Sequence, residues 1–153
     1  MKAPPAPPAP PAPPKDPLAL GLGSLGAGVA FGAACLTAAQ IVASILRGEL
    51  ERSGYRETAA DPLLAGLIAA VGVGGVCGWY RSFDLDNIWQ RGVIAVLAAV
   101  GAILIGFLAA PLDRFFGVLG MIVWLLLNIA LGILATRWAI KGKGEEGSGM
   151  STP

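Results

Sequence analysis

Four long apolar stretches constrain the fold of this chain more than any other feature of its sequence. They cover residues 18–46, 63–80, 92–110 and 115–138, and the only charged residue within them is Arg137, next to the end of the last stretch. A charge at the centre of a membrane-spanning helix costs about 2.5–3.5 kcal/mol on insertion scales, so selection for insertion produces this segregation. The pattern predicts an all-α integral membrane bundle of four transmembrane helices.

Composition and length agree with this prediction. The chain is 55% hydrophobic and 14% charged, which is more apolar and less charged than soluble domains are. The first stretch holds 29 residues, so a helix over it would measure about 43 Å and exceed a hydrocarbon core of about 30 Å. We therefore expect this helix to tilt or to protrude.

The chain divides into one membrane domain and two tails. Residues 1–16 repeat Ala-Pro-Pro, a composition that favours extended, solvated backbone, and we expect a disordered spacer there. A ligand for a proline-binding groove is the alternative. Residues 17–140 form the predicted four-helix domain, and residues 141–153 form a second disordered, polar tail.

Turn chemistry separates the stretches. Asp16 and Asp61 each precede a proline, which is the pattern of an N-cap followed by proline in the first turn. Asn87 and Gln90 have the spacing of a capping box before the third stretch. Only 111–114 separate the third and fourth stretches, so we expect a tight hairpin and antiparallel neighbouring helices.

The distribution of basic residues predicts the orientation. One side of a four-span topology would hold Lys2, Lys15, Arg81, Arg91, Arg137, Lys141 and Lys143, and the other side Arg47, Arg52, Arg56 and Arg114. The excess favours both termini in the cytoplasm of a multi-pass cell-membrane protein, with insertion in both orientations as the alternative. The predicted interfacial anchors share the first side: Trp79, Tyr80, Trp89 and Trp138.

Small residues recur every four positions in three of the stretches, which predicts faces where helices approach closely. The predicted helix-packing residues are Gly28, Gly32, Gly66, Ala70, Gly74, Gly78, Ala98, Ala102 and Gly106. The alternative use of these faces is docking of another membrane protein. The glycines of 72–78 do not form a nucleotide-binding turn, because their spacing fails that motif and they lie inside an apolar span.

The polar residues inside the spans are the candidate functional positions. Thr37, Gln40, Ser44 and Arg47 share one helical face, and Asn128 lies in the fourth stretch. We expect hydrogen bonds between helices, with Asn128 turned inward and bonded to Thr37 or Gln40. The alternative is a polar lining to a small pathway.

The residue inventory argues against catalysis. The chain has no histidine, which removes the commonest zinc ligand and general base, and its acids show no evident pairing. A net charge of +1 offers no field for nucleic acid. We therefore expect no enzyme activity, no catalytic residue, no cofactor and no metal. Cys35 and Cys77 lie in apolar stretches, where cysteine acts as a small hydrophobe.

In size and four-span layout the chain resembles the small multidrug transporters and the small fluoride channels. The first family has a glutamate inside its first helix, and no stretch here contains an acid; 26–31 also lacks the motif of the second family. The likeness is thus architectural only. We expect a non-catalytic subunit, scaffold or assembly partner, in the lipid bilayer, of another membrane protein or of itself. The alternative is a small pore or transporter lined by polar residues of the first and fourth helices.

Overall fold

The chain is all-helical in the computed structural model, which describes residues 16–52, 60–85 and 87–141. Its elements are α1 (Pro17–Arg52), α2 (Ala60–Arg81), a 3-10 turn η1 (Ser82–Asp84), α3 (Ile88–Phe107) and α4 (Ala109–Lys141). All four α-helices are long and apolar enough to cross a membrane. The all-α prediction is therefore confirmed, whereas the two predicted tails lie almost wholly outside the described residues.

Two of the predicted helix starts are confirmed by their caps. Asp16 Oδ1 accepts hydrogen bonds from the backbone N–H groups of Leu18 at 3.0 Å and Ala19 at 3.4 Å. Asn87 Oδ1 accepts from the backbone N–H of Trp89 at 3.0 Å. Gln90 forms no return bond to Asn87, so the cap of α3 is one-sided and not a full capping box.

The start of α2 differs from its prediction. The helix begins at Ala60, so Asp61 lies inside its first turn and does not precede it. Proline in the first turn of a helix removes no hydrogen bond, because the N–H it lacks would have no partner there, and so the helix extends through Pro62 to Ala60.

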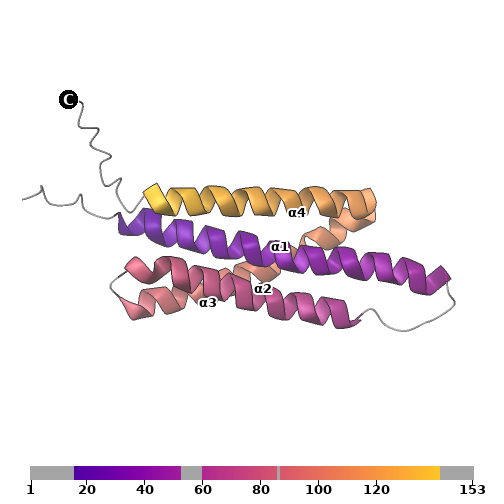
Figure 1. Cartoon of the computed structure of the whole chain (residues 1–153), viewed down its shortest axis with the longest axis horizontal. Coiled ribbons are helices and arrows are strands. Elements are labelled where there is room, and N and C mark those ends of the chain that lie inside the picture. The colour runs from indigo at the N-terminus through magenta and orange to yellow at the C-terminus, as the bar shows by residue number, and fades with distance from the viewer. Residues whose placement is uncertain (1–15, 53–59, 86, 142–153) are drawn as a thin grey trace, which may run out of the picture.

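Helix α1 lies at the centre of the bundle. Helices α2 and α3 pack on one side of it, and α4 runs along the other side (Figure 1). The described ends of α1 and α4, residues 17 and 141, lie at the same end of the bundle as the η1 turn (Figure 1). We call this the termini end, and the end that holds the α1–α2 and α3–α4 connections the far end.

The predicted hairpin between α3 and α4 is wrong. Residues 111–114 are helical and belong to α4, and α4 scarcely touches α3. The helix breaks instead at Gly117, whose φ of 61° and ψ of −160° only glycine adopts readily. The short segment 109–116 before the break carries the chain from the α3 side of α1 to the α4 side (Figure 1).

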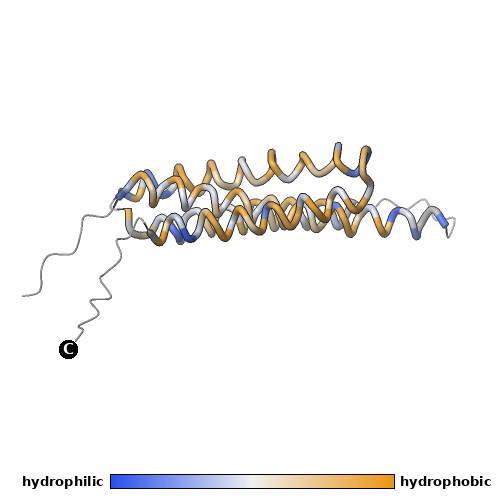
Figure 2. The backbone as a smooth tube through the Cα atoms, turned by 90° about the horizontal axis from the view of Figure 1, so that it is seen from above, coloured by the Kyte–Doolittle hydropathy of each residue, from blue (hydrophilic) through white to orange (hydrophobic). Residues whose placement is uncertain are grey.

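The length of α1 agrees with the expected protrusion. Its 36 residues measure about 54 Å, against about 30 Å for the 20 residues of α3. Its last turns extend past the other helices at the far end (Figure 1). Polar residues gather toward the ends of the tube and apolar residues fill its length (Figure 2).

The core of the bundle is built from small residues. Ala27, Ala33, Ala70, Ala98 and Ala102 are fully buried, whereas most large aliphatic and aromatic side chains point outward. Water would penalise this arrangement, but lipid tails solvate large apolar side chains and favour close contact between small ones. The fold is that expected of a helical membrane bundle.

Candidate functional site

The three predicted small-residue faces meet along one line, which we call the glycine seam. Its residues are Gly28, Gly32, Gly66, Ala70, Gly74, Gly78, Ala98, Ala102 and Gly106, and every one of them is buried. The seam joins α1 to α2 and α3, so the structure brings together all nine residues that the sequence singled out for packing.

Backbones touch directly at the centre of the seam. A Cβ added to Gly28 would lie 2.6 Å from the carbonyl oxygen of Gly74 and 2.8 Å from the Cβ of Ala98. One added to Gly32 would lie 2.7 Å from the carbonyl oxygen of Ala70. Such distances leave no room for a side chain, and α1, α2 and α3 enclose no lumen at this level.

A second close contact, between α1 and α4, was missed from the sequence. A Cβ on Gly23 would lie 2.6 Å from that of Ala139, and a Cβ on Gly132 would lie 2.9 Å from the ring of Phe31. The signal was present in the spacing of Asn128, Gly132, Ala135 and Ala139, which alternates four, three and four as coiled-coil seams do.

The intramembrane polar groups bond mainly to backbone. Thr37 Oγ1 donates to the carbonyl oxygen of Ala33 at 2.8 Å. Asn128 is 2% exposed and faces α1 as predicted, but its Nδ2 donates to the carbonyl oxygen of Trp124 in its own helix, at 2.9 Å. The predicted bond from Asn128 to Thr37 or Gln40 is therefore wrong. A short amide reaches the carbonyl one turn back in its own helix more readily than a side chain on a neighbouring helix.

Two side chains instead reach the end of α3, where the backbone N–H of the C-cap residue Leu108 is the donor that the chain itself supplies to the last carbonyls. Gln40 Nε2 of α1 donates to the carbonyl oxygen of Gly106 at 3.3 Å. Trp124 Nε1 of α4 donates to the carbonyl oxygen of Ile105 at 3.3 Å. Trp124 was not singled out by the sequence, because its role depends on where α4 lies.

A cavity of about 280 Å³ lies beside Gln40, toward the far end, and we call it the Gln40 cavity. All four helices contribute to it. Its polar lining consists of Gln40, Ser44, Arg47 and Asp113, and its other lining residues are Ala43, Leu63, Phe107, Ala110 and Met121. Thr37 does not line it.

Asn128 lies in a different place. It lines an apolar groove of about 420 Å³ between α1 and α4, together with Val29, Ile105, Leu131 and Ala135 among others. We call this the α1–α4 groove. The polar residues predicted to line a single pathway are therefore separated. Thr37 bonds to its own helix backbone, Gln40 and Ser44 line the Gln40 cavity, and Asn128 lines this groove.

The termini end carries the predicted aromatic anchors. Trp79 and Tyr80 end α2, Trp89 begins α3 and Trp138 is near the end of α4, and all four are exposed. The sequence did not single out Phe83 of η1, whose ring lies 4.0 Å from the Arg91 guanidinium carbon.

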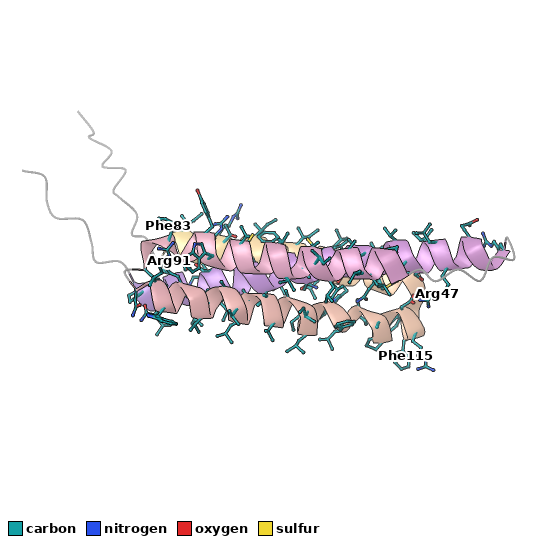
Figure 3. All side chains as sticks on the ribbon, turned by 90° about the horizontal axis from the view of Figure 1, so that it is seen from below. Arg47, Phe83, Arg91 and Phe115 are labelled. Carbon is teal, nitrogen blue, oxygen red and sulfur yellow. The ribbon has the colours of Figure 1, made fainter. Side chains whose placement is uncertain are left out.

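Arg91 joins these aromatic groups. Its guanidinium carbon also lies 4.8 Å from the ring centroid of Trp79, so it contacts two rings, of which Figure 3 labels that of Phe83. Such cation–π contacts contribute about 0.5–1 kcal/mol at exposed sites. They tie the η1 turn to α2 and α3 at the termini end.

Within the described part of the chain, no three His, Cys, Asp or Glu residues come together to hold a metal ion, and Cys35 and Cys77 are both free.

Comparison of the chain with protein-family models, with curated proteins and with solved structures finds no match.

Proposed function

We propose that this chain is a non-catalytic subunit or scaffold of the cell membrane that assembles with another membrane protein or with a second copy of itself. The observation that carries the proposal is the closed interior of the bundle. Backbones meet along the glycine seam, and the amide and hydroxyl groups of Thr37 and Asn128 turn to carbonyls of their own helices. An interior built in this way holds helices together and offers no path for a solute.

The position of α4 supports an assembly role. This helix packs mainly on α1 and scarcely touches α3, so the α1–α4 groove stays open along one side of α1. The groove has apolar walls and small residues such as Gly26 and Ala30, which allow a lipid-embedded helix to approach closely. Val29 and Leu131 offer it larger apolar contacts.

The proposed orientation places both termini in the cytoplasm. It rests on the excess of Lys and Arg on the termini side of the sequence, and the aromatic anchors at the termini end support an interface there. The anchors mark a membrane surface without saying which one, so the basic residues alone decide the direction.

A small pore or transporter is the second candidate, and the Gln40 cavity is the observation in its favour. The cavity has a polar entrance toward the far end of the bundle, lined by Gln40, Ser44, Arg47 and Asp113. A conducting role would require this entrance to continue through the bundle, where the glycine seam lies.

Co-purification in mild detergent separates the two functions. We expect tagged protein to carry one larger membrane protein in constant ratio, and expect Leu131→Trp in the groove to lose that protein. Leu127→Trp is the matched control, because Leu127 is similarly exposed on α4 and does not line the groove. Purification as a homo-oligomer alone, with ion or solute flux in liposomes, would support the pore.

A further inference from the structure

We propose that the Gln40 cavity binds a zwitterionic group in which a primary ammonium stands close to an anion, as in the headgroup of an ethanolamine phospholipid. This inference is independent of the function proposed above, since a lipid site serves a scaffold and a transporter equally. It starts from one unsatisfied atom. Gln40 is 8% exposed, and its Oε1 is buried without a hydrogen-bond partner among the residues that the structure describes.

The orientation of the Gln40 amide is fixed by its other contact. The carbonyl oxygen of Gly106 can only accept a hydrogen bond, so the amide atom facing it must be Nε2. The other amide heteroatom of Gln40, Oε1, is therefore a hydrogen-bond acceptor. A buried acceptor left without a donor costs about 1–3 kcal/mol, so a bound N–H or O–H group would stabilise this position.

Two opposite charges line the same cavity without neutralising each other. In the described part of the chain, neither Arg47 nor Asp113 has an ion-pair partner within 4.0 Å. Arg47 is exposed and Asp113 is half-buried, so both charged groups are open to a bound partner. A single ion would pair with one of them only, whereas a zwitterion presents an anion to Arg47 and a cation to Asp113.

The acceptors select the kind of cation. Gln40 Oε1 and the Asp113 carboxylate both accept hydrogen bonds, so they favour a primary ammonium, which has three N–H donors, over a quaternary ammonium, which has none. The Arg47 guanidinium presents a planar fork of donors that matches phosphate or carboxylate oxygens. Ser44 adds a hydroxyl to the lining.

The place of the cavity favours a lipid as the source of this group. Arg47 lies at the far end of the bundle, close to the turn of α4 that also bears Phe115 (Figure 3). Leu63, Phe107 and Met121 complete the cavity wall with apolar surface suited to the upper part of an acyl chain. A free amine–phosphate solute shares the same recognition chemistry.

Thermal unfolding of delipidated full-length protein in detergent tests the proposal. Dioleoyl phosphatidylethanolamine should raise the unfolding temperature at concentrations about tenfold lower than dioleoyl phosphatidylcholine, because only the former offers N–H donors. Soluble phosphoethanolamine is the third probe. If phosphoethanolamine raises the unfolding temperature as strongly as the ethanolamine lipid does, the same site is supported, with a free solute as its natural ligand.

Paired variants locate the effect. Arg47→Gln and Asp113→Asn should each weaken the ethanolamine lipid response about tenfold, the effect of losing one charge-assisted contact. Arg114→Gln and Glu49→Gln are matched controls outside the cavity, and they should leave the response to the ethanolamine lipid unchanged. Equal responses to the two lipids, or full responses in both cavity variants, would overturn the proposal; the lipid comparison on the unmodified chain stands even where a variant folds poorly.

Discussion

Gln40 of α1 donates a hydrogen bond to the carbonyl oxygen of Gly106, one residue before α3 ends. The bond joins two helices at the end of α3, and Trp124 of α4 likewise donates to the carbonyl oxygen of Ile105, which also accepts from the backbone N–H of Leu108. Side chains from two helices, Gln40 from the central helix α1 and Trp124 from α4, thus hold the end of α3.

Replacement of Gln40 by Leu should loosen this junction. The variant removes the donor to Gly106, and we expect the free energy of unfolding to fall by about 0.6–1.7 kcal/mol, the range measured for hydrogen bonds between membrane helices. Reversible unfolding in mixed micelles gives the value. Gln90→Leu, at an exposed position of α3, is the control, and an equal loss in both variants would contradict the role given to Gln40.

Gly74 offers the sharpest test of the glycine seam. An added Cβ would lie 3.2 Å from the Ala98 carbonyl oxygen and 3.3 Å from that of Gly28, so Gly74→Leu must separate three helices. We expect a loss of at least about 3 kcal/mol or failure to fold. Gly72→Leu makes the same chemical change two residues earlier, where nothing lies within 4 Å of the new Cβ. Equal stability of the two variants in detergent would refute the seam.

The outcome at α4 shows what the sequence could predict and what it could not. Hydropathy located four long apolar helices, and Asp16 and Asn87 marked two helix starts. A four-residue period of small residues located the glycine seam. Each of these signals is local in the sequence. The side of α1 on which α4 packs depends on the backbone break at Gly117, and nothing distinguishes that glycine in sequence from Gly120 nearby. The bonding of Asn128 and Trp124 follows from this placement, so it too was out of reach.

Gly117→Ala should therefore disturb the course of the chain between α3 and α4. A φ of 61° with a ψ of −160° is essentially restricted to glycine, and a side chain there costs about 1–3 kcal/mol. The substituted Cβ would meet nothing within 4 Å, so the penalty is conformational and not steric. Gly48→Ala, which also has open space and keeps a negative φ, is the control for thermal stability in detergent. A Gly117→Ala variant as stable as Gly48→Ala would contradict the break.

Cysteine labelling tests the orientation. With Cys35 and Cys77 removed, Ser148→Cys should resist a membrane-impermeant maleimide in intact cells and Ser53→Cys should react, because the excess of basic residues assigns residue 148 to the cytoplasm and residue 53 to the opposite side. Permeabilised cells provide the control, in which both positions should label. Labelling of Ser148→Cys in intact cells would reverse the assignment.

Asn128→Leu distinguishes the scaffold from the pore. Asn128 lies outside the Gln40 cavity, and its Nδ2 bonds to a carbonyl of its own helix, so the structure gives it no place along a polar path. We expect the variant to lose at most about 2 kcal/mol of stability, with Leu preserving the volume at the contact with α1. A scaffold should then retain its partner at the same ratio on co-purification. If the protein conducts, and if Asn128→Leu abolishes flux in liposomes while the bundle stays folded, then a path passes between α1 and α4 and the closed-interior argument for a scaffold fails.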